Sequence, residues 1–255
     1  MSQLTIDESK IDYRVRGQIN VRGKLVDIPA IYKGKAITTL FPISTKKAKE
    51  IINCSRVKPA EIYPGRSLLS LTLFNFYWSP VGPYTELVPS IPVFYSATYK
   101  IPLFPLLFYK SLKDFGFFVI DILQSTDIAI EHGNLLTGYP HNPNLIDVIF
   151  QEKGGRINIK AIGGGKDICA LSIKKPVKEK IAKEMYMTYF TKDKDLFEIR
   201  MDIYGIESSV WGCKLNLGDH ATSNLIKDLK PSVNSIQTRY FRDVIEINPV
   251  TKRIL

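Results

Sequence analysis

Short apolar segments bounded by turn-forming residues recur along most of the chain, and this pattern constrains the fold more than any other feature. The segments are rich in β-branched and aromatic residues and lack the 3.6-residue period of a helix. Turns of the hairpin type separate some of them, at residues 152–155 and 163–165. The segments cover residues 67–77, 91–99, 145–151, 156–161, 168–173, 185–190, 196–204, 209–215 and 240–247. The pattern predicts an α+β chain that is mainly β, with antiparallel sheets and few peripheral helices.

Helical patterns are confined to short segments. In residues 44–53, Ala48, Ile51 and Ile52 form one apolar face at the spacing i, i+3, i+4, and Ser44 can cap the first turn. Residues 223–229 predict a second short helix.

Residues 101–116 do not fit either pattern cleanly. Prolines interrupt this aromatic stretch, in which Phe108, Leu112 and Phe115 have helical spacing. The spacing predicts a short helix packed on the sheet, or a lid, and packing in the core is the favoured interpretation.

The composition is that of a globular protein of one domain. Of the 255 residues, 45% are hydrophobic and 24% are charged, which excludes a disordered chain, a collagen and a disulfide scaffold. We expect a single domain over residues 1–255. The 35 basic and 25 acidic residues give a net charge of +10, which favours anionic partners such as nucleic acid, anionic lipid or a carboxylate ligand.

Cysteine usage and hydropathy predict a cytoplasmic protein without membrane segments. Cys54, Cys169 and Cys213 are scattered and odd in number, which fits free thiols in a reducing compartment. The N-terminal residues show neither the basic nor the apolar region of a signal peptide. The longest uncharged run, residues 67–85, contains serines, an asparagine and two prolines, so a buried strand followed by a turn is expected there.

The chain lacks three common functional motifs. The glycines at 163–165 precede Lys166 but lack the spacer and the hydroxyl residue of a phosphate loop. His132, His141 and His220 share no metal-ligand spacing, and no Gly-x-Ser-x-Gly elbow is present. We therefore expect neither a metal nor a cofactor.

Two other stretches suggest a site. Glu86 stands alone between apolar segments, so it either reaches solvent or is buried with a partner. If it is buried, its pKa rises and it can transfer protons near neutral pH. Residues 133–142 contain two glycines and a Tyr-Pro pair before His141 and Asn142, which predicts a constrained loop of the kind that often carries function.

Three motifs in order resemble the acetoacetate decarboxylase family. They are Tyr84-Thr85-Glu86 with Ile91-Pro92-Val93, then Gly133 and Gly138-Tyr139-Pro140, then Leu217-Gly218-Asp219-His220-Ala221. Each motif is short, and their order and spacing over roughly residues 30–249 make the resemblance specific. The resemblance implies antiparallel sheets curled into a cone or barrel around a buried cavity, in a homo-oligomer.

The resemblance also implies a chemistry. In the decarboxylases a buried lysine forms an iminium with a β-keto acid, and an adjacent cation and an apolar pocket lower the pKa of that lysine; this enzyme is the standard example of such activation. The family's pocket glutamate corresponds to Glu86, which we expect to be catalytic. Tyr84 and Tyr139 of the same motifs are expected to contact substrate.

The chain departs from the family at the decisive position. The decarboxylases carry the reactive lysine and its lysine neighbour directly after the Tyr-Pro pair, where this chain has His141 and Asn142. A histidine cannot form the stable iminium of a primary amine. We therefore expect His141, with an ordinary pKa of about 6.5, to act as a second catalytic group in acid–base chemistry beside a carbonyl, with Asn142 contacting substrate.

Other residues could complete the site. Lys33 or Lys35 is expected to hold a substrate carboxylate, with Arg66 or Arg22 as alternatives, and Lys100, Lys110 or Lys113 could replace the missing lysine. Asp219 is expected to cap the helix that follows it, and His220 to order the turn. The set of predicted site residues is thus Glu86, His141, Tyr84, Tyr139, Asn142, Lys33 and Lys35.

Three classes of function remain open from the sequence. The first is a lyase-type enzyme acting on a small oxo acid or related carbonyl compound. The second is a non-catalytic binding protein for a carboxylate or apolar ligand. The third is nucleic-acid binding by the lysines at residues 174–183, but these lack interleaved aromatics or a known motif, so we expect a solvated face there and no nucleic-acid or membrane partner.

Overall fold

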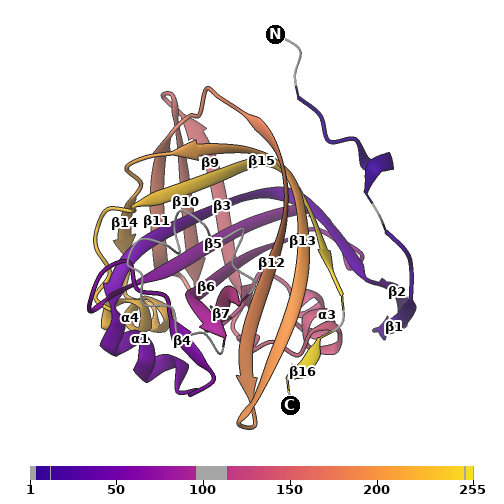
Figure 1. Ribbon diagram of the computed structural model, residues 1–255. Coiled ribbons are helices and arrows are strands. Elements are labelled where there is room, and N and C mark those ends of the chain that lie inside the picture. The colour runs from indigo at the N-terminus through magenta and orange to yellow at the C-terminus, as the bar shows by residue number, and fades with distance from the viewer. Residues whose placement is uncertain (1–3, 12, 96–113, 250, 255) are drawn as a thin grey trace.

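A closed barrel of seven strands forms the body of the protein (Figure 1). The computed structural model describes residues 4–11, 13–95, 114–249 and 251–254. Around the barrel the strands follow the order β12 (Lys180–Lys192), β7 (Phe115–Val119), β6 (Tyr84–Tyr95), β5 (Arg66–Trp78), β3 (Ala30–Ser44), β15 (Gln237–Asn248) and β13 (Asp195–Val210). β13 pairs again with β12 and closes the ring, so the predicted mainly β class and barrel are confirmed.

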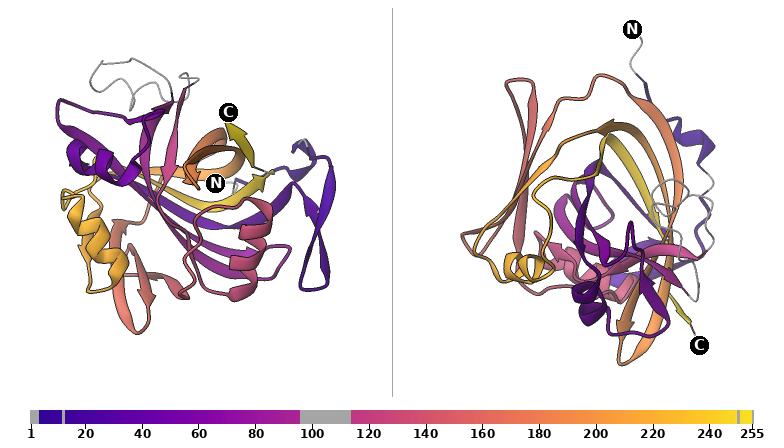
Figure 2. Two further views of the ribbon diagram at one scale, coloured as in Figure 1. Left: turned by 90° about the horizontal axis from the view of Figure 1, so that it is seen from below. Right: turned by 60° about the vertical axis from the view of Figure 1, so that its left-hand side comes forward.

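Shorter strands extend the barrel sheet, and others form a separate four-stranded sheet and a two-stranded hairpin. On the barrel sheet, β4 (Val57–Pro59) and β8 (Leu123–Gln124) pair with β6, and β16 (Lys252–Ile254) pairs with β13. A second sheet has the order β14 (Lys214–Leu217), β11 (Lys166–Lys174), β10 (Arg156–Gly163) and β9 (Ile146–Lys153). The hairpin of β1 (Gly17–Val21) and β2 (Lys24–Ile28) stands to one side, as Figure 2 shows.

The described helices are short. All are peripheral except α3 (Asp127–Leu136), which lies at the mouth of the barrel. They are η1 (Glu8–Lys10), α1 (Thr45–Ile52), α3 (Asp127–Leu136) and α4 (Ala221–Asp228). The predicted helix at 44–53 is confirmed as α1, which Ser44 caps through a bond from the Lys47 amide. The predicted helix at 223–229 is confirmed as α4.

The barrel strands that pack against the second sheet are buried on both faces. Along β5, Leu69, Leu71 and Leu73 belong to the core that the barrel wall forms with the second sheet. The residues between them, such as Ser70 and Thr72, face the interior of the barrel. This alternation has the period of two expected for a strand. Burial on both faces explains why residues 67–77 form one long apolar run.

The structure corrects some of the predicted strand limits. The single strand expected at 209–215 is two strands, because β13 ends at Val210 and Gly212 has φ of 75° before β14 begins. Phe115 and Gly116, expected in a helical stretch, lie in β7. A Cβ on Gly116 would lie 2.6 Å from the Met187 carbonyl oxygen, so the close approach of β12 needs glycine there. The remainder of the stretch up to residue 113 lies outside the described residues.

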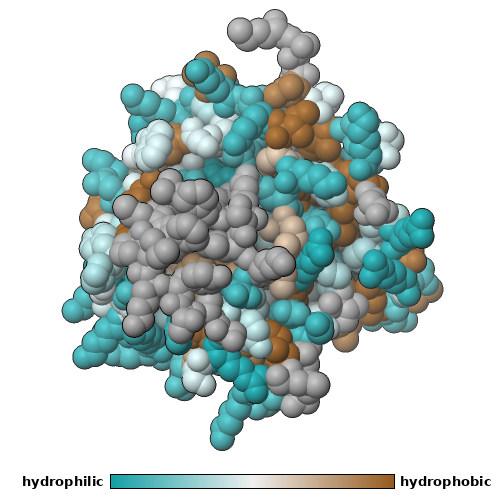
Figure 3. Space-filling model, in the orientation of Figure 1, coloured by the Kyte–Doolittle hydropathy of each residue, from teal (hydrophilic) through white to brown (hydrophobic). Residues whose placement is uncertain are grey.

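Two further findings concern the cysteines and the membrane. The thiols of Cys54, Cys169 and Cys213 are all free. Within the part of the chain that the structure describes, no helix has the length and hydropathy to cross a bilayer. On the face drawn in Figure 3, hydrophilic residues surround separate hydrophobic patches.

Candidate active site inside the barrel

The interior of the barrel contains a partly open cavity of about 110 Å³. Every barrel strand contributes to its wall, and α3 and the segment after it close one side. Aromatic and aliphatic side chains cover most of the wall, among them Phe74, Val88, Phe117, Val119, Ile122, Met201, Ile203, Phe241 and Val244. The polar lining side chains include Glu86, Glu246, His132, His141, Gln124 and Asn248. A mostly apolar pocket with a few converging polar groups is the usual form of a small-molecule site.

Glu86 lies on the inner face of β6 and is buried, with 9% of its surface exposed. Gln124 of β8, its cross-strand partner, donates an amide hydrogen to the Glu86 carboxyl at 2.7 Å. Burial raises the pKa of Glu86 to about 8, and the nearby Glu246 charge adds to the rise. Hydrogen bonds from Gln124 and Tyr84 oppose the rise without offsetting it. Glu86 is therefore largely protonated at neutral pH.

Glu246 approaches the same space from β15. The Asn248 side chain donates to its carboxyl at 2.7 Å. Burial raises the pKa of Glu246 to about 7. The cavity thus contains two carboxyl groups that titrate near neutral pH and disfavour each other's ionisation.

His141 and His132 are the two imidazoles of the cavity. Burial lowers the pKa of each to about 4, so both are neutral at pH 7. His132 lies on α3 and stacks at a tilt against Tyr32, with ring centroids 5.9 Å apart. His141 follows α3 and packs against Gly133, where a Cβ would come within 2.3 Å of the imidazole Cε1 atom.

The backbone brings Glu86 and His141 to the same cavity. Glu86 pairs with Gln124 on one side of the short strand, and His141 forms a bridge with Ile122 on the other side. Positions 122 and 124 are two apart, so their side chains point to one face of that strand. Both line the cavity, as do Glu86 and His141.

Tyr84 and Tyr139 line the cavity and are buried. Burial raises the pKa of both phenols, so they remain protonated donors. The Tyr139 hydroxyl is hydrogen-bonded to Thr188. Its ring packs on Phe190 with centroids 4.9 Å apart, which fixes the loop that carries His141.

Several buried polar atoms around the cavity have no hydrogen-bond partner in the structure. They are Gln124 Oε1, His132 Nε2, both ring nitrogens of His141, Glu246 Oε2 and Asn248 Oδ1. Buried polar atoms are almost always hydrogen-bonded in proteins. Because these atoms gather in one cavity, we expect a polar ligand, or water, to form hydrogen bonds with them there.

The remaining predicted site residues lie outside the cavity wall. Lys33 pairs with Glu8 at 2.7 Å, and the Lys35 ammonium lies 5.2 Å from the Phe150 ring centroid. Tyr32 of β3 lines the cavity, so the period of two directs both lysines to the opposite face. Neither is placed to hold a ligand in the cavity. Asn142 also points elsewhere, because it donates to Asp121 at 2.8 Å.

The alternative cations and the predicted cap also have other roles. Arg22 pairs with Glu131 at 2.6 Å, and Arg66 donates to Ser232 at 3.0 Å. Lys100, Lys110 and Lys113 lie outside the described residues. Asp219 does not cap α4. His220 does so instead, since its Nδ1 accepts from the Thr222 amide at 3.1 Å.

His132, Glu246, Gln124 and Asn248 were missed by sequence reasoning. His132 lies on α3, and residues 133–142 were expected to be a loop, although Gly133 lies in that helix. Glu246 and Asn248 are two apart on β15, a spacing that could have indicated one shared face. Nothing in the sequence indicated that this face borders the same cavity as Glu86.

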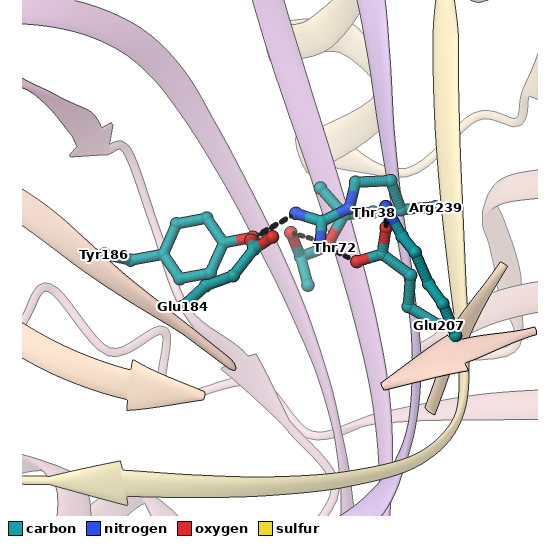
Figure 4. A network of polar contacts seen from close by, with 7 residues as sticks. Thr38, Thr72, Glu184, Tyr186, Glu207 and Arg239 are labelled. Carbon is teal, nitrogen blue, oxygen red and sulfur yellow. Dashed lines mark hydrogen bonds and ion pairs between the residues drawn. The ribbon is translucent and has the colours of Figure 1, made fainter. Parts of the chain in front are cut away.

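A second buried polar cluster lies on the inner side of the barrel wall (Figure 4). Arg239 of β15 pairs with Glu184 of β12 at 2.6 Å, and it also pairs with Glu207 of β13. Tyr186 joins the cluster through bonds to Glu184 and Arg239, and its side chain also lines the cavity. The cluster links the three neighbouring strands that close the barrel.

Within the described residues, no lysine lines the cavity. Nor does any group of three or more histidine, cysteine or acidic residues in this part of the chain lie close enough to hold a metal ion.

Comparisons with known proteins place the fold. No known sequence family and no curated protein matches the chain. Among solved structures, an acetoacetate decarboxylase matches with a TM-score of 0.65 and 13% identity, over 89% of each chain. The acetoacetate decarboxylase of Legionella pneumophila matches with a TM-score of 0.63 and 12% identity, over 100% of this chain and 98% of that one. The enduracididine biosynthesis enzyme MppR, complexed with pyruvate, matches with a TM-score of 0.63 and 9% identity, over 93% of this chain and 98% of that one. The chain has the acetoacetate decarboxylase-like fold.

Proposed function

We propose that the protein is an acetoacetate decarboxylase-like enzyme that performs lyase-type chemistry on a small oxo acid or related carbonyl compound. The observation that carries the proposal is the convergence of Glu86 and His141 on one buried cavity, through β8 and the adjoining Ile122. The likeness to acetoacetate decarboxylase and to an enzyme complexed with pyruvate supports a carbonyl substrate.

The ionisation of these groups supports proton transfer beside a carbonyl. With a pKa of about 8, Glu86 is a much stronger base than an ordinary carboxylate, and a fraction of it is ionised at neutral pH. The ionised fraction removes a proton from the carbon next to the carbonyl, and the electron pair moves onto the carbonyl oxygen. His141, with a pKa of about 4, is a weak base, but its neutral ring can donate a hydrogen bond to that oxygen.

This mechanism needs no iminium at position 141. The motif resemblance puts the family's reactive lysine where this chain has His141. A general acid–base step forms the enolate directly. The enolate then adds to a second carbonyl in an aldol-type step, expels a β-hydroxyl as water in a dehydration, or is protonated on oxygen to give the enol. A binding protein without turnover is the outcome if the cavity admits the compound but catalyses no exchange.

Deuterium exchange tests this function. We will follow the protons next to the carbonyl of pyruvate and of 4-phenylbutan-2-one in D₂O by NMR. The wild-type protein is expected to accelerate exchange of at least one probe by tenfold or more over buffer, on the order of 1.4 kcal/mol of barrier. Glu86→Gln and His141→Ala are expected to lose the acceleration. Glu50→Gln, a change on the exposed side of α1, serves as the matched control.

The contrary results are equally defined. Exchange of both probes at the buffer rate with the wild-type protein would leave a binding protein as the better account. Full acceleration by Glu86→Gln would remove that carboxyl from the mechanism.

Restoring a lysine tests the shape of the pocket. In His141→Lys, the apolar cavity is expected to keep part of the amine unprotonated, so the lysine attacks acetoacetate and sodium borohydride traps the adduct. Mass spectrometry is expected to find the adduct in His141→Lys and not in wild type. An adduct on wild-type protein would show that another lysine forms the iminium and would contradict the mechanism above.

A further inference from the structure

The unpartnered atoms of the cavity are mostly acceptors. The amide hydrogens of Gln124 and Asn248 are directed to the two carboxyls, which leaves the amide oxygens of both residues without donors. Glu246 Oε2 also lacks a donor. These side chains are all at least nine-tenths buried, apart from Asn248, so water outside the cavity does not satisfy them. A ligand that forms hydrogen bonds with these three oxygen atoms must itself carry hydrogen-bond donors.

The two carboxyl groups of the cavity, Glu86 and Glu246, favour a positively charged donor over a neutral one. Glu86 and Glu246 raise each other's cost of ionisation because they face the same low-dielectric space. A cation between them would favour the ionised form of both carboxyls, whereas an anion would oppose their ionisation further.

Aromatic rings surround the same acidic groups. Tyr32 contacts Tyr84 edge to face with ring centroids 6.4 Å apart, and Tyr32 and Phe76 lie 5.4 Å apart. Glu246 and Glu86 act on the phenols of both tyrosines, which places the rings beside the carboxyls. Aromatic rings are among the groups with which proteins bind ammonium ions.

We propose that the ligand of this cavity carries a protonated amine, which binds between Glu246, Glu86 and the Tyr32–Tyr84 pair. The proposal rests on the proposed function, because it uses the same cavity, and it narrows the substrate from a simple oxo acid to a carbonyl compound that carries an amine. The apolar wall of Phe74, Phe117 and Phe241 would hold the body of the ligand.

Three probes that differ only in head-group charge test the proposal. Phenethylamine, 2-phenylethanol and 3-phenylpropanoate share a phenyl ring and a two-carbon spacer. By titration calorimetry on the wild-type protein, phenethylamine is expected to bind at least tenfold more tightly than either other probe, a difference of about 1.4 kcal/mol. Equal affinity for the three, tighter binding of the carboxylate, or no binding of the amine would overturn the proposal.

Two further measurements separate recognition of the amine from general binding. Amine binding at pH 7 is expected to release protons, measured in buffers of different ionisation enthalpy, because Glu246 and Glu86 become ionised. The other ionisable groups facing Glu246 are Tyr32, Tyr84 and Tyr139, and the neutral His132 and His141 share the cavity. Absence of proton release would contradict the proposed pairing.

The variant Glu246→Gln tests whether Glu246 causes the tighter binding of the amine. Glu246→Gln is expected to reduce the amine's advantage to about threefold or less, and Glu50→Gln is expected to keep it. If Glu246→Gln does not fold, the three-probe comparison on wild type still decides the proposal. The deuterium exchange of 4-phenylbutan-2-one involves no amine, so the amine preference can fail while the proposed function stands.

Discussion

Burial acts in opposite directions on the two kinds of titratable side chain in the cavity. It raises the pKa of Glu86 and Glu246, to about 8 and about 7, and lowers that of His132 and His141 to about 4. In each case the neutral form is favoured, since water no longer solvates the charge. At neutral pH the site therefore contains mostly uncharged acids and bases.

The raised pKa of Glu86 makes stability depend on pH. Between about pH 4.5 and 8 the folded state binds more protons at Glu86 than the unfolded state, so its contribution to stability is lost as the pH rises through about 8. The two histidines act with the opposite sign, between about pH 4 and 6.5. Of these four cavity groups, only the two carboxyls act above pH 6.5. Urea denaturation is expected to show that the free energy of unfolding of wild type falls by about 2 kcal/mol more from pH 6 to 8 than that of Glu86→Gln. Parallel pH profiles of the two proteins would contradict the assignment.

Sequence reasoning selected Glu86 and His141 because each stands in a motif with informative neighbours, and the structure places both side chains on the cavity wall. It also expected Lys33 and Lys35 in the site, but neither lines the cavity, because the register of β3 decides which alternate residues face inward and a one-residue difference reverses the face. His132 and Glu246 carried no motif. Only the closed barrel brings them to the cavity.

At the scale of elements, α3 and the loop after it fix the position of His141. Gly133 lets the imidazole lie against the helix, because a Cβ would come within 2.3 Å of the ring. Ala in place of Gly inside a helix usually stabilises it by about 1 kcal/mol. Here we expect Gly133→Ala to destabilise the protein and reduce proton exchange, since the ring has to move. Thermal unfolding and the exchange assay measure the two effects.

The double variant supplies the control. In Gly133→Ala/His141→Ala the ring is absent, so the alanine at 133 is expected to recover its ordinary helical gain relative to His141→Ala alone. The same loss of stability in both backgrounds would show that the contact with His141 is not the cause.

The strands were largely predictable from their turn residues and apolar runs, and the two helices α1 and α4 from their periodicity. α3 was not predicted, because residues 133–142 read as a loop on account of Gly133, Gly138 and Pro140. A cap at Thr126 and burial of Ala129, His132 and Leu136 stabilise the helix instead. Tertiary packing outweighs the local preference of glycine in this case.

At the scale of the whole molecule, the barrel depends on the buried pairing of Arg239 with Glu184 and Glu207 across three strands. Replacing Arg239 with Met would remove the buried cation that Glu184 and Glu207 share, while Glu207 would keep its contact with Lys180 at 3.2 Å. The free energy of unfolding is expected to fall by about 3–5 kcal/mol. Adding Glu184→Gln and Glu207→Gln is expected to recover part of this loss in urea denaturation. A loss below about 1 kcal/mol for Arg239→Met would show that the cluster does little for closure.

The most direct test of the account is the NMR spectrum of the three histidines in ¹⁵N-histidine-labelled protein, recorded with and without 4-phenylbutan-2-one. His132 and His141 are expected to stay neutral down to about pH 4 and to shift when the ketone is added, because both line the cavity. His220, which caps α4 and does not line the cavity, is expected not to respond to the ketone. If His141 instead titrates near its ordinary pKa of about 6.5 and ignores the ketone, the central claim of a buried, ligand-binding Glu86–His141 site is contradicted.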